Sequence, residues 1–124
     1  MTSFELMKTL VLGASTNQKR FSFKAIERLH KYGHEVVAIG VRIGQIGNIQ
    51  ITTNKLLFPN IDTIALYLSP NRQKEYYDYI ISLKPRRIIF NPGTENPLFA
   101  KMAKENGIKT YNSCVLVMLA LNKY

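Results

Sequence analysis

Lys8-Thr9-Leu10-Val11-Leu12-Gly13-Ala14-Ser15-Thr16 carries the clearest indication of the fold class. Its apolar middle, residues 10–12, runs into a glycine, which is typical of a buried parallel strand. Further apolar strand patterns alternate with helical patterns, without a linker, repeat or low-complexity tract, and this predicts a parallel sheet with crossover helices. We therefore expect a single α/β domain over residues 7–124 with a mostly parallel five-stranded sheet and helices on both faces, after a disordered extension over residues 1–6.

The predicted elements are separated by glycines, prolines and small polar residues. Strands are expected at residues 10–12, 35–40, 63–68, 87–90 and 108–111, and helices at residues 22–32, 70–83, 97–107 and 114–122. Gly33 is a natural left-handed cap for the first helix, and Asn112 or Ser113 is expected to cap the last. Residues 42–60 are less regular, with a glycine-marked turn and a short strand near residues 49–51.

The segment that follows the first strand predicts a phosphate-binding loop. Ser22 is a good N-cap, so the loop before it is expected over the carboxyl end of the strand, where open α/β sheets bind ligands. Backbone N–H groups at the start of a helix attract anions, and Lys19 and Arg20 add two cations. An ordinary strand-to-helix turn is the alternative. The residues expected to contact phosphate are Gly13, Ala14, Ser15, Thr16, Lys19, Arg20 and Ser22.

The glycine pattern disfavours a standard NAD site. The usual dinucleotide fingerprint has three glycines, of which this loop supplies only Gly13. The second predicted strand runs into Gly40-Val41-Arg42, where an NAD-binding protein places an acid that binds the ribose. Arg42 suits a ribose that carries a phosphate, and a solvated loop arginine is the alternative.

Four turns follow predicted strands and are expected to meet at one edge of the sheet. Because the carboxyl ends of parallel strands lie together, these turns predict one elongated cleft. They are Gly13-Ala14-Ser15, Gly40-Val41-Arg42, Leu68-Ser69-Pro70 and Asn91-Pro92-Gly93-Thr94.

The composition narrows the class of protein. The chain has 124 residues, of which 46% are hydrophobic, enough for one buried core. The chain has a single cysteine, Cys114, which excludes an internal disulfide. With only two histidines besides, it has too few typical metal ligands for us to predict a metal cluster. A reducing, cytoplasmic setting is expected. No apolar stretch approaches the roughly 20 residues that cross a bilayer, and residues 1–6 lack the features of a signal peptide, so no membrane partner is predicted.

The net charge of +9 predicts an anionic partner. The 17 cations are scattered, and the chain shows no helix-turn-helix, zinc-finger or aromatic RNA-binding signature. A small polyphosphate ligand therefore fits better than a specific nucleic acid. A protein that binds nucleic acid through its net charge is an alternative hypothesis.

Catalytic groups are scarce in the predicted cleft. Cys114 starts the last helix, but no histidine is placed near it, so a buried inert cysteine is the expected state. Glu95 is the only acid near the rim, and a lone carboxylate is a weak basis for acid–base catalysis. Residues 114–121 are apolar on every helical face, so the part that does not pack on the sheet is expected to be covered by the loop at residues 42–60 or by a second subunit in a homodimer.

In this order and spacing, the turns resemble the coenzyme A-binding domain family over residues 7 to about 121. The fold of that family is shared with the amino-terminal domain of the succinyl-CoA synthetase alpha subunit. Gly13-Ala14-Ser15 with Arg20-Phe21-Ser22 is similar to the family's Gly-x-Ser loop followed by Arg-x-Ser, and residues 91–96 resemble its turn beside the pantetheine arm. The family's Asn-Pro after the second strand is replaced here by Gly40-Val41-Arg42.

The resemblance implies a Rossmann-like fold that binds coenzyme A (CoA) or an acyl-CoA. The diphosphate would lie at Gly13–Ser22, the pantetheine arm would reach Asn91–Glu95, and Arg42 would meet the 3′-phosphate. Because the predicted rim lacks an acid–base pair, we expect binding without catalysis. An NADP-dependent reductase and an acyl-CoA enzyme that uses Cys114 are the alternatives.

Overall fold

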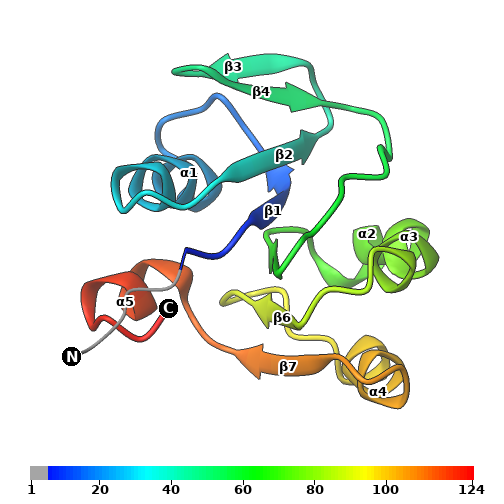
Figure 1. Cartoon of the computed structure of the whole chain (residues 1–124). Helices are drawn as coiled ribbons and strands as arrows, with labels where there is room; N and C mark the ends of the chain where they lie inside the picture. The colour runs from blue at the N-terminus through cyan, green and yellow to red at the C-terminus, as the bar shows by residue number, and fades with distance from the viewer. Residues whose placement is uncertain (1–5) are drawn as a thin grey trace.

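The computed structural model describes residues 6–124, so the expectation for residues 1–6 lies outside the described residues except at Leu6. Seven strands form one sheet in the order β3-β4-β2-β1-β5-β6-β7 (Figure 1). The α/β fold is confirmed, but the predicted count of five strands is wrong. The strands are β1 Thr9–Ala14, β2 Val36–Gly40, β3 Gly44–Ile46, β4 Ile49–Thr52, β5 Thr63–Leu66, β6 Arg87–Phe90 and β7 Lys109–Asn112.

The additional strands come from a hairpin in the region expected to be irregular. Ile46 pairs with Ile49 across a two-residue loop, in which Gly47 has a φ of +58° that favours glycine. β4 then pairs in parallel with β2, so only β3 runs antiparallel within the sheet. The hairpin extends the sheet beyond β2 and flanks the loop that follows β1.

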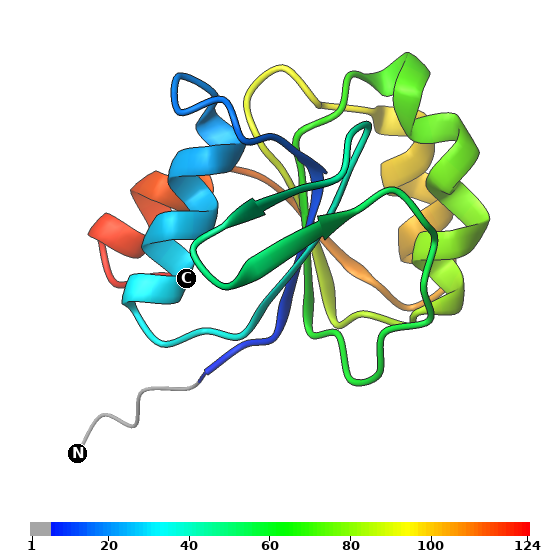
Figure 2. The same cartoon turned by 90° about the horizontal axis from the view of Figure 1, so that it is seen from above.

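Helices cover both faces of the sheet, as predicted. In Figures 1 and 2, α1 and α5 lie on one face, and α2, α3 and α4 lie on the other. The expected helix over residues 70–83 is interrupted by a 3-10 turn at Lys74–Tyr76, directly after the buried Gln73. The helices are α1 Phe21–Lys31, α2 Pro70–Gln73, α3 Tyr77–Ser82, α4 Pro97–Glu105 and α5 Val115–Ala120. No helix within residues 6–124 is long and apolar enough to span a membrane.

The core has two layers because alternate strand residues point to opposite faces. Leu10, Leu12 and Phe90 pack with Phe99 of α4 on one face. Val11, Ala65 and Ile89 belong to the other layer, which contains α1 and α5. The central strands are therefore buried on both sides, as expected of a parallel sheet.

Two helix starts differ in detail from the sequence prediction, whereas α4 begins at Pro97 as predicted. The N-cap of α1 is Arg20 rather than Ser22, which is buried within the first turn. Cys114, not Asn112 or Ser113, occupies the N-cap position of α5. Asn96 caps α4, and its side-chain oxygen accepts a hydrogen bond from the Phe99 N–H at 3.1 Å.

Helix α5 presents two kinds of apolar side chain. Val115 and Leu119 are buried against the sheet, whereas Val117 and Leu121 are more than half exposed. One face of the helix is thus covered by the molecule itself. The homodimer that would cover the exposed pair stays a prediction.

Candidate functional site

A cleft of about 360 Å³ opens at the carboxyl ends of β1, β5 and β6. Figure 2 shows the loops that follow these strands gathered along one edge of the sheet. The cleft is lined by Gly13, Ala14, Ser15, Arg20, Phe21, Ser22, Val41, Tyr67, Leu68, Ser69, Arg72, Pro92, Gly93 and Thr94.

Two glycines allow the backbone segments around the cleft to come close together. Gly13 has a φ of +99°, and a Cβ there would lie 2.9 Å from the carbonyl carbon and oxygen of Tyr67. A Cβ on Gly40 would lie 2.3 Å from the carbonyl oxygen of Ala14. Side chains at either position would push the ends of neighbouring strands apart. Gly40 therefore allows the end of β2 to lie close to Ala14, which lines the cleft, although Gly40 itself does not line it.

The loop between β1 and α1 is held by its own hydrogen bonds. The Ser15 hydroxyl oxygen accepts from the Asn17 N–H at 3.0 Å. The Asn17 side-chain oxygen accepts from the Lys19 N–H at 3.0 Å, and its carbonyl accepts from the Arg20 N–H at 3.0 Å. These short-range bonds fix the course of the loop without using the N–H groups in the first turn of α1.

The start of α1 has the properties of an anion site. No side chain caps it, and its first turn contains no acid. Arg20, Phe21 and Ser22 all line the cleft, so the positive end of the helix and one guanidinium face the same space. The predicted phosphate loop therefore has geometry suited to phosphate.

The turn after β6 forms the other end of the cleft and is internally bonded. Asn91 is buried, and its side chain donates to the Leu66 carbonyl at 3.0 Å and accepts from the Val115 N–H at 2.9 Å. The Thr94 hydroxyl donates to the Asn91 carbonyl at 2.8 Å. Asn91 thus joins the turn to β5 and α5 and is not available to a ligand.

Gln73 joins two of the turns that form the cleft. Its side-chain amide donates to the carbonyls of Leu68 and Thr94, each at 2.8 Å. Its oxygen accepts from the Asn96 side chain at 2.9 Å, and Asn96 also donates to the Tyr77 hydroxyl at 2.8 Å. Gln73 is completely buried, so the turns after β5 and β6 are held at a fixed separation.

The structure brings most of the predicted site residues together. Those that line the cleft are Gly13, Ala14, Ser15, Arg20, Ser22, Val41, Leu68, Ser69, Pro92, Gly93 and Thr94. Predicted residues that do not line it are Thr16, Lys19, Gly40, Arg42, Pro70, Asn91 and Glu95. Lining residues missed by the sequence analysis are Phe21, Tyr67 and Arg72.

Local contacts account for two of the predicted residues outside the lining. The methyl group of Thr16 lies 2.5 Å from where a Cβ on Gly44 would be, so Thr16 packs against β3. The Glu95 carboxylate accepts from the Gly93 N–H at 2.9 Å and so stabilises the turn.

Tyr67 contributes a buried hydroxyl behind the cleft. Its oxygen has no hydrogen-bond partner within the described residues, and burial raises the pKa of Tyr67 far above its usual range. Cys114, half-buried, also raises this pKa electrostatically but does not itself line the cleft. Tyr67 therefore stays neutral at physiological pH.

The sequence pattern of a family described as "CoA binding domain" matches residues 7–120. The chain belongs to this CoA binding domain family. Membership supports CoA binding in general.

Solved structures of similar proteins share the fold of this CoA binding domain. The crystal structure of an uncharacterized protein is 40% identical with a TM-score of 0.95, and the match covers 98% of this chain and all of that one. A hypothetical protein from Pyrococcus horikoshii is 22% identical with a TM-score of 0.82, covering 90% and 80% of the two chains. A protein from Thermus thermophilus is 19% identical with a TM-score of 0.84, covering 96% and 91%. The comparison with curated proteins found no match.

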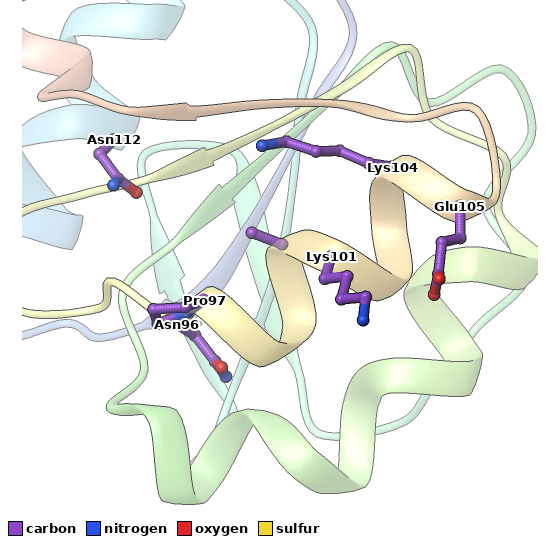
Figure 3. Close-up of a pocket in the computed structure, with 7 residues that line it drawn as sticks. Asn96, Pro97, Lys101, Lys104, Glu105 and Asn112 are labelled. Atoms are coloured by element: carbon purple, nitrogen blue, oxygen red, sulfur yellow. The ribbon is translucent and has the colours of Figure 1, made fainter.

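A larger hollow of about 560 Å³ lies elsewhere on this CoA binding domain, between α4 and the edge strand β7 (Figure 3). Lys101, Lys104 and Asn112 are among the residues around it. Among residues 6–124, its lining includes none from the start of α1 or from the loop after β1. We place the candidate site in the smaller cleft, because ligands of open α/β sheets bind where several strands end.

The opposite end of the CoA binding domain holds a second polar cluster. Arg87 is 5% exposed; its Nε donates to the Thr63 hydroxyl at 2.8 Å, and its guanidinium lies 4.5 Å from the Tyr124 ring centre. The Tyr124 and Thr9 hydroxyls are hydrogen bonded at 2.5 Å. The His34 Nδ1 accepts from the backbone N–H of Met7 at 2.9 Å. These contacts lie at the amino ends of the strands and join the segment after α5 to the sheet.

Proposed function

We propose that this CoA binding domain holds CoA or an acyl-CoA in the cleft at the carboxyl ends of β1, β5 and β6, without catalysis of its own. The diphosphate would lie at the start of α1 beside Arg20. The pantetheine arm would run toward the turns after β5 and β6, between Ser69 and Gly93.

One observation carries the proposal: Arg20 and a helix start that no side chain caps border a cleft that, among residues 6–124, no acid lines. A diphosphate supplies the negative charge that this arrangement favours. The close approach of Gly13 to the Tyr67 carbonyl brings the loop after β1 next to the turn after β5, so that both border the same cleft. Family membership supports CoA as the source of that diphosphate.

Titration calorimetry tests the choice of ligand. CoA is expected to bind more tightly than NAD⁺, because no acid of residues 6–124 lines the cleft to bind an unphosphorylated ribose. It is expected to bind more tightly than NADPH, because the loop after β1 has only one of the three glycines of a dinucleotide fingerprint. Mass spectrometry of the intact native protein, followed by release and identification of any bound small molecule, gives an independent readout. Tighter binding of NADPH than of CoA would contradict the proposal and favour a reductase.

The non-catalytic part of the proposal rests on the residues around the cleft. Within residues 6–124, its lining contains neither an acid–base pair nor a cysteine–histidine couple, and Cys114 lies outside it. Incubation with acetyl-CoA is therefore expected to leave the intact mass unchanged. Stoichiometric acetylation that disappears in Cys114→Ser would show an acyl-enzyme and overturn this part alone.

A further inference from the structure

Arg72 places a second cation in the cleft, on the side away from Arg20. Arg20 precedes α1 on one face of the sheet, whereas Arg72 belongs to α2 on the other (Figure 1). Both line the cleft, and none of its lining residues within 6–124 is an acid. The cleft therefore offers positive charge at two separate positions.

Within residues 6–124, the side chain of Arg72 takes part in neither ion pair of the molecule, which join Lys8 to Glu35 and Arg86 to Asp62. Glu75, the nearest acid along the chain, is hydrogen bonded to Tyr76, and Arg72 also acts on Tyr76 electrostatically. Arg72 is exposed to solvent at the cleft and able to reorient toward a ligand.

The position of Arg72 along the cleft follows from the residue next to it. Gln73 is bonded to the carbonyls of Leu68 and Thr94, so Arg72 lies beside the turns after β5 and β6. These turns are where the proposed function places the far end of the pantetheine arm. That arm carries amides and a thiol and has no anion to pair with a guanidinium, whereas the diphosphate lies beside Arg20.

We propose that Arg72 makes the cleft selective for acyl-CoA molecules whose acyl group ends in a carboxylate. This inference rests on the proposed function, because it takes the diphosphate as bound at the start of α1. A carboxylate at the end of the acyl group would receive two parallel N–H bonds from the Arg72 guanidinium. Gln73 supports this selection by fixing the first turn of α2 against the turn at Thr94.

Shape-matched pairs of ligands test the selection by calorimetry. Malonyl-CoA is compared with isovaleryl-CoA, and glutaryl-CoA with hexanoyl-CoA, so that each pair differs mainly in the terminal carboxylate. The wild-type protein is expected to bind at least one carboxylate-bearing ligand about fivefold more tightly than its neutral counterpart, since the contact is partly solvent-exposed. Arg72→Gln is expected to remove this preference, and Arg72→Lys to retain part of it.

Two controls separate the role of Arg72 from general charge. Lys101→Gln removes one positive charge from the other hollow and is expected to leave the preference intact. Free CoA is expected to bind wild type and Arg72→Gln equally. A fall in CoA affinity in Arg72→Gln that is absent with dephospho-CoA would assign Arg72 to the 3′-phosphate and overturn the inference.

The outcomes also distinguish this inference from the proposed function. If free CoA binds but neither carboxylate-bearing ligand is preferred by wild type, the selection by Arg72 is wrong and the proposed function stands. If no form of CoA binds, both are wrong.

Discussion

The two ends of the sheet differ in whether their arginines are bonded within the protein. At the amino end, Arg87, Thr63 and Tyr124 bond to or stack on one another. At the carboxyl end, Arg20 and Arg72 line a cleft that has no acid among its described lining residues, and no side chain caps the first turn of α1. The difference indicates that Arg87 at the amino end stabilises the fold, whereas the two arginines of the cleft are available to a ligand. Substitutions at the two ends should therefore separate stability from binding.

The largest effect is expected at the amino end. Arg87→Met removes a buried guanidinium and its bond to Thr63, and should lower the free energy of unfolding by about 2–3 kcal/mol. Urea denaturation measures this change, and CoA affinity should stay the same. Arg86→Met is the control, since its ion pair with Asp62 is partly exposed and worth at most about 1 kcal/mol. Equal losses of unfolding free energy in Arg87→Met and Arg86→Met would contradict the idea that the buried Arg87 stabilises the fold.

The matching substitution in the cleft is Arg20→Gln. It should weaken CoA binding by about 1.5–2 kcal/mol through loss of a charge-assisted phosphate bond, while unfolding changes by less than about 0.5 kcal/mol. Calorimetry and urea denaturation measure the two quantities. Arg28→Gln, on the exposed side of α1, provides a control of equal charge. If CoA affinity is unchanged in Arg20→Gln, Arg20 is a solvated surface residue that does not contact the phosphate.

A dependence of stability on pH should arise from the amino end. Burial, with Arg87 as the second cause, lowers the pKa of His34 below its usual value of 6.5. The unfolded chain therefore takes up a proton near pH 6.5 while the folded protein does not, so stability is full above that pH and falls as the pH decreases below it. Urea denaturation between pH 7.5 and 5.5 measures the slope. The slope should shrink in His34→Asn and persist in His30→Asn, where the histidine is exposed.

The smallest effect is expected for Lys19→Gln. Lys19 belongs to the same loop as Arg20 but does not line the cleft. Its charge acts through solvent, so CoA affinity should change by no more than about 0.3 kcal/mol and the change should vanish in high salt. A loss as large as that of Arg20→Gln would show that the loop closes over the ligand.

The sequence predicted the layers of the fold because buried parallel strands are continuous apolar runs. The strand at residues 87–90 has the predicted bounds, and Gly33 has the expected positive φ of +87° after α1. The short strand expected near residues 49–51 is present as β4. Its pairing with β3 was missed, although Gly47-Asn48 between two isoleucines is a recognisable hairpin signal.

The cleft was predicted less completely than the fold, because tertiary contacts decide which side chains reach it. Asn71-Arg72-Gln73-Lys74 is uniformly polar, so nothing in the sequence distinguishes the buried Gln73 from the exposed Arg72. Ser22 was expected to cap α1, but the turn at Asn17 lets the helix begin earlier, with the Lys24 N–H donating to the Arg20 carbonyl. Loop geometry of this kind depends on bonds between neighbouring backbone groups.

The two hydrogen bonds from the Gln73 amide, to the Leu68 and Thr94 carbonyls, affect how a ligand enters the cleft. Two turns that are tied together before binding need not be ordered by it, so association should lose little conformational entropy and proceed without a slow rearrangement. Stopped-flow traces would then show a single phase whose rate rises linearly with ligand concentration. Amide hydrogens of the two turns would exchange slowly even in the empty protein.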